Sequence, residues 1–118
     1  MAWDIEFTDE FGEWFRDLDD AEKVSVTASV DLLEELGPAL GRPHVDTLKG
    51  SRVQNMKELR VQHAGKPYRI LFAFDPRQTG ILLIGGRKGA KDWYRKTIAV
   101  AERLYAKYLM ELKKEGLL

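Results

Sequence analysis

Hydrophobic and polar positions change their spacing several times along the chain, and each change predicts a new structural element. Residues 3–7, WDIEF, alternate apolar and polar side chains, which predicts a short β-strand. Thr8 can then accept a hydrogen bond from the first turn of a helix, and the aspartates at 19–20 can do the same for a second helix. Gly37 followed by Pro38 ends the second helical pattern. A strand and two antiparallel helices are therefore expected at the start of the chain.

The middle of the chain predicts a small antiparallel sheet. Residues 39–52 contain Gly and Pro, lack a clean period and are expected to form a loop. Three apolar stretches follow, at 55–62, 67–74 and 80–86, and the short segments between them are rich in turn residues. Asp92 can cap a long C-terminal helix. The pattern predicts an α+β fold with the helices on one face of the sheet.

Composition narrows the class of protein. The 118 residues include no cysteine, which excludes disulfides, thiol nucleophiles and Cys-ligated metals. No apolar stretch approaches the roughly 20 residues of a membrane-spanning helix. The N-terminus lacks the basic and apolar regions of a signal peptide. We therefore expect a single cytoplasmic domain over residues 1–118, without contact to a membrane.

The formal net charge is zero, but the charges are distributed unequally along the chain. Residues 1–40 hold 12 acidic and 2 basic side chains, a net charge of −10, and residues 41–118 hold 17 basic and 7 acidic ones, a net charge of +10. A basic region attracts phosphate groups, although an acidic surface that balances a basic one gives the same counts. Charge alone leaves binding to a polyanion open.

Strand alternation places several charged side chains on one face of the predicted sheet. In MKELRV, Leu59 and Val61 are expected to face the helices. Glu58 and Arg60 then point to the opposite face, which is expected to be open, and the alternation in YRILFAF sends Arg69 to the same face. Arg60 and Arg69 can therefore lie on adjacent strands with Glu58 within reach. A cross-strand ion pair without further function is the alternative.

The stretch LIGGRKGAKDWYRK, residues 83–96, leaves the last strand of this sheet. Its two glycines allow the backbone to bend or to approach a partner closely. Three cations and two aromatic side chains are expected at the rim of the open face: Arg87, Lys88, Lys91, Trp93 and Tyr94. Arginine and lysine bind phosphates and aromatic rings stack on unpaired bases, so this set is typical of an RNA site. A solvated turn between a strand and a helix is the alternative.

The ordered motifs MKELRV, GKPYRILFAF, ILLIGGRKG and WY resemble the RelE/ParE superfamily of bacterial toxins, most closely its phage Gp49-like branch with the HigB-type toxins. The resemblance implies an N-terminal strand, two antiparallel helices, a three-stranded antiparallel meander and a C-terminal helix. It also implies ribosome-dependent cleavage of mRNA by attack of the 2′-OH on the adjacent phosphate, without a metal or cofactor. A ParE-like inhibitor of DNA gyrase, which acts by binding alone, and a simple binding module are the alternatives.

The resemblance assigns roles to individual residues. By motif, Arg69 matches the phosphate-binding arginine, and Lys88 or Arg87 matches the basic residue after the third meander strand. Tyr94 matches a tyrosine that stacks on a base or aids proton transfer. Some relatives have lysines where this chain has Met56 and Glu58, and Glu58 is the candidate general base here. The predicted catalytic residues are Glu58, Arg69, Lys88 and Tyr94, and the predicted RNA-binding residues are Arg60, Arg87, Lys91 and Trp93.

Both histidines lie outside this set, since His44 falls in the predicted loop and His63 at a hairpin tip. A metal site is not expected from two histidines. The resemblance also implies a partner, a helix-turn-helix antitoxin that silences the toxin in a complex of higher order. The motifs leave open whether the antitoxin covers the open face or binds the acidic helices.

Overall fold

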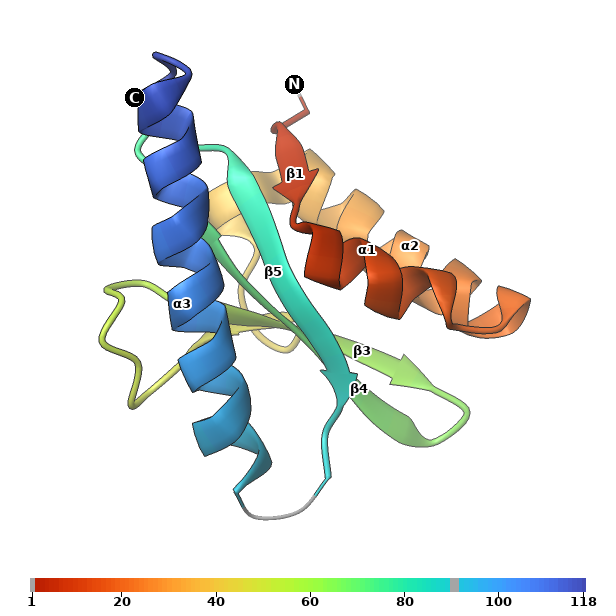
Figure 1. The fold of residues 1–118 in the computed structure, drawn as a ribbon. Coiled ribbons are helices and arrows are strands. Elements are labelled where there is room, and N and C mark those ends of the chain that lie inside the picture. Colours follow the sequence, from red (N-terminus) through yellow and green to blue (C-terminus); the bar gives the residue numbers. More distant parts are fainter. Residues whose placement is uncertain (1, 90–91) are drawn as a thin grey trace.

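The computed structural model describes residues 2–89 and 92–118. In chain order the elements are β1 (Ile5–Phe7), α1 (Asp9–Arg16), α2 (Asp20–Leu36), the short 3-10 helix η1 (Gly37–Ala39), β2 (Val45–Thr47), β3 (Lys57–His63), β4 (Lys66–Phe74), β5 (Gly80–Arg87) and α3 (Trp93–Lys114). A mixed sheet lies between helices, and β5 runs between α3 and α1 in the view of Figure 1.

Within the described residues the sheet has five strands in the order β1-β5-β4-β3-β2. β3, β4 and β5 form the predicted antiparallel meander, which is confirmed. β1 pairs in parallel with β5, and β2 pairs antiparallel with β3. The expectation that residues 39–52 form only a loop is wrong, because Val45 is buried in the core and lies opposite Leu59. A strand of three residues is too short for its alternation to stand out in the sequence.

The first two helices begin, and the second ends, at the residues that the sequence predicted. Oγ1 of Thr8 accepts a hydrogen bond from the backbone N–H of Phe11 at 3.0 Å. Asp19 and Glu22 form a capping box at the start of α2, with bonds of 2.7 and 2.9 Å. Gly37 ends α2 with a φ of +56°, a backbone conformation that glycine adopts without a steric penalty. These ends are set by short-range contacts and were therefore readable in the sequence.

Helices cover both faces of the sheet. α1 and α2 pack on one face over a core that includes Leu59, Ile70 and Phe72. α3 packs on the other face, over a second core that includes Leu71 and Leu83 (Figure 1). The expectation that all helices lie on one face is therefore wrong. The second face of β4 and β5 also carries apolar side chains, and the hydrophobic effect favours covering them.

Two adjacent glycines on β5 allow aromatic rings to approach both faces. A Cβ atom on Gly85 would lie 2.2 Å from the Trp14 ring of α1, and one on Gly86 would lie 3.1 Å from the Trp93 ring of α3. Gly86 thus lets the first residue of α3 lie against the strand. Asp92 holds the predicted N-cap position of α3, but its side chain makes no capping hydrogen bond within the described residues and pairs with side chains of the first turn.

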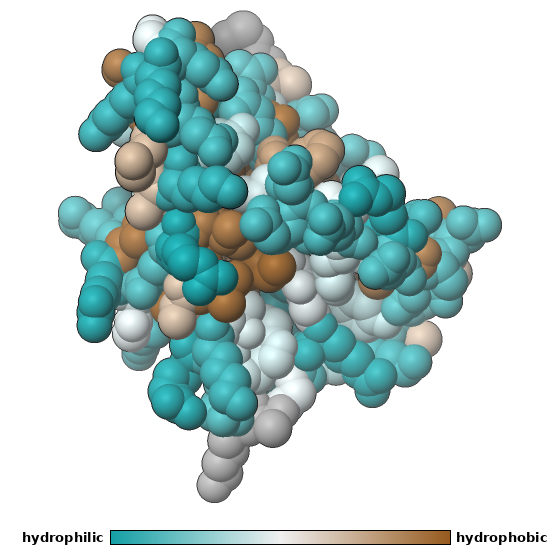
Figure 2. All heavy atoms as spheres, in the orientation of Figure 1, coloured by the Kyte–Doolittle hydropathy of each residue, from teal (hydrophilic) through white to brown (hydrophobic). Residues whose placement is uncertain are grey.

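The surface seen in Figure 2 is mostly hydrophilic, and hydrophobic residues gather over β5 between α3 and α1. A hollow of about 220 Å³ in this region is lined in part by Ile84 and Val100. Among the described residues, no helix is both long and apolar enough to cross a membrane.

An ion cluster at the C-terminal part of α3 joins three elements; we call it the Arg77 cluster, made of Glu6, Asp75, Arg77 and Tyr108. The Arg77 guanidinium lies 2.7 Å from Asp75 and 3.0 Å from Glu6 of β1. Glu6 also accepts a hydrogen bond from the Tyr108 hydroxyl of α3 at 2.6 Å. These contacts tie the turn after β4 to β1 and to α3, and so hold α3 against the sheet.

Candidate active site

A buried carboxylate, Glu58, lies at the centre of the charged residues that the sequence predicted on one face of the sheet. Only 7% of its side chain is exposed. Oε1 of Glu58 accepts a hydrogen bond from the Tyr94 hydroxyl at 2.5 Å and lies 3.3 Å from Nε of Arg69. Oε2 accepts a hydrogen bond from the Arg60 guanidinium at 3.2 Å. The structure therefore brings Glu58, Arg60, Arg69 and Tyr94 into direct contact, and we call them the Glu58 cluster.

Strand register places the members of the Glu58 cluster side by side. Arg60 on β3 lies opposite Arg69 on β4, and Arg69 lies opposite Gly86 on β5. Glu58 is two residues before Arg60 and shares its face. Tyr94 reaches the same place from the first turn of α3. The face predicted to be open is thus covered by α3 along part of its length, and the cluster lies beside the N-terminus of that helix.

Tyr94 is held in its protonated form. Burial raises the pKa of its hydroxyl, and the hydrogen bond to Glu58 raises it further. The hydrogen bond to Glu58 is already one in which the phenol donates its proton. At neutral pH Tyr94 is therefore a proton donor.

The two guanidinium groups retain hydrogen-bonding capacity. Nη1 of Arg69 donates to the backbone oxygen of Tyr68 at 3.0 Å. Nε of Arg69 and Nε of Arg60 are buried and have no hydrogen-bond acceptor within the described residues. The 3.3 Å approach of Arg69 to Glu58 lacks the angle of a hydrogen bond, so this contact is ionic. Buried donors without acceptors are unusual in proteins, and they single out Arg60 and Arg69 as candidate functional residues.

A second acid, Asp46 on β2, contacts the cluster and was not predicted from the sequence. Its Oδ2 atom lies 3.3 Å from the Arg60 guanidinium and 3.2 Å from that of Arg42. The hydrogen bond from Arg42 is the main reason that the pKa of Asp46 lies below its ordinary value. Arg60 is therefore held between Asp46 and Glu58. The apolar Val45 directly before Asp46 was the only feature of the sequence that could have indicated a strand here. The surrounding residues do not alternate regularly between apolar and polar.

Lys88 and Trp93 flank Tyr94. The Lys88 ammonium lies 5.4 Å from the centre of the Tyr94 ring, a cation-π distance, and the Lys88 side chain is exposed to solvent. The rings of Trp93 and Tyr94 meet edge to face with their centres 5.0 Å apart. The structure thus brings Lys88 and Trp93 to the Glu58 cluster, as predicted. Lys91 lies outside the described residues, and its predicted role remains a prediction.

Arg87 does not join the cluster, and the expectation that it overhangs this face is wrong. Simple alternation along β5 would place it there, but the pairing with β4 skips one residue, Leu83, in a β-bulge that reverses the alternation. Arg87 lies opposite Tyr68, which belongs to the core under α1 and α2. The pKa of Tyr68 is raised first by its hydrogen bond to Glu22, and Arg87 acts in the opposite direction. The charge of Arg87 therefore belongs to the α1 and α2 face.

The two histidines also lie away from the cluster. His63 shares a hydrogen bond of 2.7 Å with the Ser25 hydroxyl of α2, and its ring lies edge-on to Tyr68. His44 is exposed just before β2. Neither imidazole therefore contacts Glu58 or Tyr94, in agreement with the sequence analysis.

The arrangement has a clear chemical capacity. Glu58 can accept a proton, Tyr94 can donate one, and Arg60, Arg69 and Lys88 place positive charge beside them. Within residues 2–89 and 92–118 there is no group of three or more histidine and acidic side chains placed to hold a metal ion. The set is suited to acid-base chemistry on a substrate that carries negative charge.

The model of one protein family, phage derived protein Gp49-like (DUF891), matches residues 13–106. This chain belongs to the Gp49-like family. Two relatives named as toxins come from Mycobacterium tuberculosis (strain ATCC 25618 / H37Rv). HigB2 is 44% identical over 103 residues, which cover 85% of this chain and 51% of HigB2. HigB3 is 50% identical over 92 residues, which cover 76% of this chain and 79% of HigB3.

This Gp49-like chain therefore spans about half the length of HigB2 and more of HigB3. Its fold is similar to that of the isolated E. coli RelE toxin, with a TM-score of 0.58 and 12% identity over 83% of this chain and 97% of RelE. It is also similar to a chain of the toxin-antitoxin complex RelBE2 from Mycobacterium tuberculosis, with a TM-score of 0.55 and 14% identity over 75% of this chain and 100% of that chain. The predicted α+β fold of the RelE type and the HigB-type resemblance are confirmed.

Proposed function

We propose that this protein is the toxin of a toxin-antitoxin pair and inhibits translation by cleaving mRNA at the ribosome. Its place in the Gp49-like family and its similarity to HigB2 and HigB3 support the toxin role. The hydrogen bond between Tyr94 and Glu58, beside Arg69, is the observation that carries the ribonuclease role. It joins a proton donor, a proton acceptor and a cation at one place, and cleavage of RNA by its own 2′-OH needs all three.

In the proposed reaction, the 2′ oxygen of one nucleotide forms a bond to the adjacent phosphorus, and the bond from phosphorus to the 5′ oxygen of the next nucleotide breaks. Glu58 accepts the proton of the 2′-OH, and Tyr94 gives its proton to the leaving 5′ oxygen. Arg69 and Lys88 stabilise the charge on the phosphoryl oxygens. The products are a 2′,3′-cyclic phosphate and a 5′-OH end.

The same contact provides a route that resets the site. After the reaction Glu58 carries an extra proton and Tyr94 lacks one. Transfer of that proton along their 2.5 Å hydrogen bond restores both groups without exchange with solvent. The remaining residues bind the strand, with Arg60 and Lys91 proposed as phosphate contacts and Trp93 as a stacking platform for a base.

We also propose that the protein acts in the cytoplasm with a cognate antitoxin. RelBE2 of Mycobacterium tuberculosis, which shares the fold, is described as a toxin-antitoxin complex. A helix-turn-helix antitoxin and an assembly of higher order belong to the same proposal and rest on the family resemblance. Copurification of the protein with the product of a neighbouring gene tests this part.

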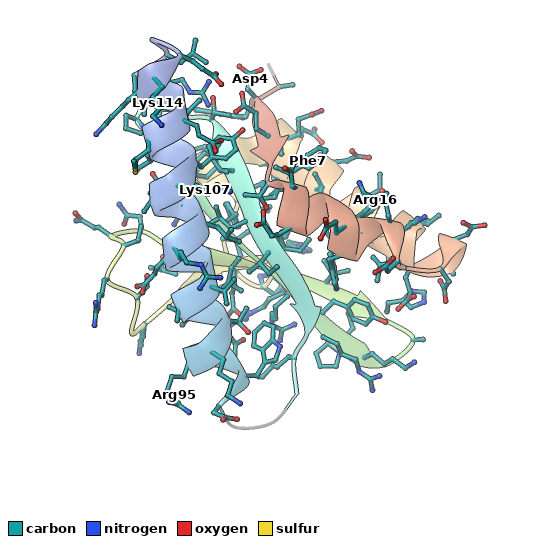
Figure 3. All side chains as sticks on the ribbon, viewed as in Figure 1. Asp4, Phe7, Arg16, Arg95, Lys107 and Lys114 are labelled. Atoms are coloured by element: carbon teal, nitrogen blue, oxygen red, sulfur yellow. The ribbon has the colours of Figure 1, made fainter. Side chains whose placement is uncertain are left out.

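The direct test is translation of a defined mRNA by purified ribosomes, with the 5′ ends of the RNA mapped after the protein is added. We expect new 5′-OH ends that require ribosomes and fall sharply with Arg69→Ala or Tyr94→Phe. Arg16→Ala is the matched control, because Arg16 is an exposed arginine at the end of α1 (Figure 3). It should cleave like the unchanged protein.

Intact mRNA at high protein concentration would contradict the ribonuclease proposal. A DNA gyrase supercoiling assay then separates the ParE-like alternative from a simple binding module. Inhibition of gyrase that persists with Arg69→Ala and Tyr94→Phe would assign the protein to the ParE-like class.

A further inference from the structure

A basic groove adjoins the Glu58 cluster. It has a volume of about 890 Å³ and lies between the loop after β2 and the first three turns of α3. Figure 1 shows this loop beside the N-terminal half of α3. Tyr94 lines both the groove and the cluster, so the two sites are continuous. The cationic residues that line the groove are Lys49, Arg52, Arg95 and Arg103.

The loop is fixed to α3 by Glu102, the one acidic residue among the described residues that line the groove. Oε2 of Glu102 accepts a hydrogen bond of 2.9 Å from the Ser51 hydroxyl and another from the backbone N–H of Arg52. The Ser51 oxygen in turn accepts the N–H of Val53 at 3.1 Å. The bond from Arg52 is the main reason that the pKa of Glu102 lies below its ordinary value. The loop therefore engages Oε2 of Glu102. This contact holds the loop against α3, and the cationic side chains line the groove between them.

These cations are available to a ligand. The guanidinium groups of Arg52 and Arg103 are exposed, and within residues 2–89 and 92–118 they form no ion pair. Lys49 is exposed as well, and Arg95 pairs only with Asp92, at 3.5 Å. An open groove with several unpaired cations raises the local concentration of polyanions. The sequence did not predict this site, since the four cations come from two segments that meet only in the folded chain.

We propose that this groove binds the sugar-phosphate backbone of RNA beyond the nucleotides held at the Glu58 cluster. The inference rests on the proposed function for the kind of polyanion, and on the groove itself for the location. Tyr94 connects the two sites, so a strand with its reactive phosphate at Glu58 and Arg69 can continue along Arg52 and Arg103. Four of the residues that line the groove are cationic and one is acidic, so the groove favours backbone phosphates over base edges.

The substrate strand and ribosomal RNA have the same sugar-phosphate backbone, so either could bind in the groove. Two sets of binding measurements, called arms below, distinguish them. The first arm measures binding of free 2′-O-methyl RNA, which lacks the attacking hydroxyl, at lengths of about 4 and about 12 nucleotides. The second arm measures binding to ribosomes programmed with an mRNA that carries the same modification. Both arms are repeated between about 50 and about 200 mM KCl.

The test variant is Arg52→Ala with Arg103→Ala, and the matched control is Lys107→Ala with Lys114→Ala. Both variants remove two exposed cations. Figure 3 shows Lys107 and Lys114 farther along α3 from the end that carries Arg95. Within the described residues, none of these four side chains forms an ion pair. The midpoint of thermal unfolding should therefore be unchanged in both variants.

We expect the test variant to bind about tenfold more weakly in at least one arm. The slope of the logarithm of the binding constant against the logarithm of the salt concentration should become shallower by about 0.7 for each phosphate contact that is lost. Loss with the longer free RNA but not the shorter one assigns the groove to the substrate strand. Loss only with ribosomes assigns it to ribosomal RNA. The control variant should bind like the unchanged protein in both arms.

Binding by the test variant that equals the control in both arms would overturn the proposal. A competition experiment with the unchanged protein could also overturn it. If an acidic peptide displaces bound RNA as effectively as unlabelled RNA does, the groove suits a protein partner instead. These outcomes are independent of the ribonuclease proposal, which fails if mRNA stays intact at high concentrations of the unchanged protein.

Discussion

The hydroxyl of Tyr94 on α3 donates a hydrogen bond to the buried carboxylate of Glu58 on β3, a residue 36 positions earlier in the chain. This contact fixes the start of α3 to the sheet at the point where Arg60 and Arg69 meet across two strands. It combines a structural tie with an acid-base pair. Substitutions at its two ends should therefore separate binding, catalysis and folding.

Glu58→Gln should remove the proposed proton acceptor and lower the rate of mRNA cleavage by about 100-fold to 10,000-fold. Binding of 2′-O-methyl RNA should persist or become tighter, because the change removes a negative charge beside Arg60 and Arg69. Single-turnover cleavage and RNA titration measure the two effects. Glu111→Gln, an exposed change on α3, is the control. Cleavage at the unchanged rate would remove Glu58 from the proposed mechanism.

Tyr94→Phe should lower cleavage by about 100-fold or more, because it removes the proposed proton donor and keeps the aromatic ring. Tyr94→Ala should lose the ring as well and weaken RNA binding by a further 1–3 kcal/mol, roughly the value of one stacked base. Measured dissociation constants for both variants separate the two roles. Equal RNA affinity in the two variants would show that the ring does not stack on RNA.

Two glycine variants should separate stability from positioning. Gly85→Ala places a methyl group 2.2 Å from the Trp14 ring and should destabilise the fold by about 1–3 kcal/mol in urea unfolding. Gly86→Ala places it 3.1 Å from Trp93, at the first turn of α3, where the ring can shift by a few tenths of an ångström. Compared with Gly85→Ala, Gly86→Ala should therefore lower the free energy of unfolding less. It should lower the rate of cleavage more, since Tyr94 moves with Trp93. The reverse order would contradict this assignment.

Arg77→Ala should destabilise the fold without changing the site. The side chain of Asp75 is fully buried and would lose its cationic partner, at a cost of about 3 kcal/mol. Tyr108, which completes the Arg77 cluster, lies about 21 Å along α3 from Tyr94. Urea unfolding measures the loss, and cleavage at low temperature should remain normal. An unchanged free energy of unfolding would show that the Arg77 cluster does not stabilise α3 against the sheet.

Glu6 should make stability depend on acid pH. Its pKa is lowered from its ordinary value of 4.5, first by the hydrogen bond from Tyr108 and also by Arg77, although burial acts in the opposite direction. The unfolded chain therefore binds a proton at higher pH than the folded chain. The stabilisation is present above about pH 4.5 and is lost as the pH falls through the lower folded pKa.

Glu6→Gln should flatten this loss of unfolding free energy as the pH falls below about 4.5. Urea unfolding at several pH values measures it. Glu13→Gln is the control, because Glu13 is an exposed acid on α1. If the two variants show the same dependence on pH as the unchanged protein, the Glu6 contacts contribute nothing to acid stability.

Local patterns in the sequence determined the meander, the capped helices and the shared face of Glu58, Arg60 and Arg69. These features follow from contacts a few residues apart and from the alternation of side chains along a strand. The motif after β5 likewise predicted that Lys88, Trp93 and Tyr94 lie at this site. Each of these residues is fixed by its distance in sequence from a recognisable strand or helix end.

Only the tertiary structure decided which partners these residues meet. Alternation shows that Glu58 points away from α1 and α2, but not that α3 crosses that face and brings the Tyr94 hydroxyl to it. The bulge at Leu83 is a property of the pairing between two strands, and it moved Arg87 to the opposite face. Asp46 and the basic groove depend on segments that meet through the sheet and through Glu102. The periodicity of one segment carries no information on the segment that packs against it, and this is why the sequence named most of the site while only the fold assembled it.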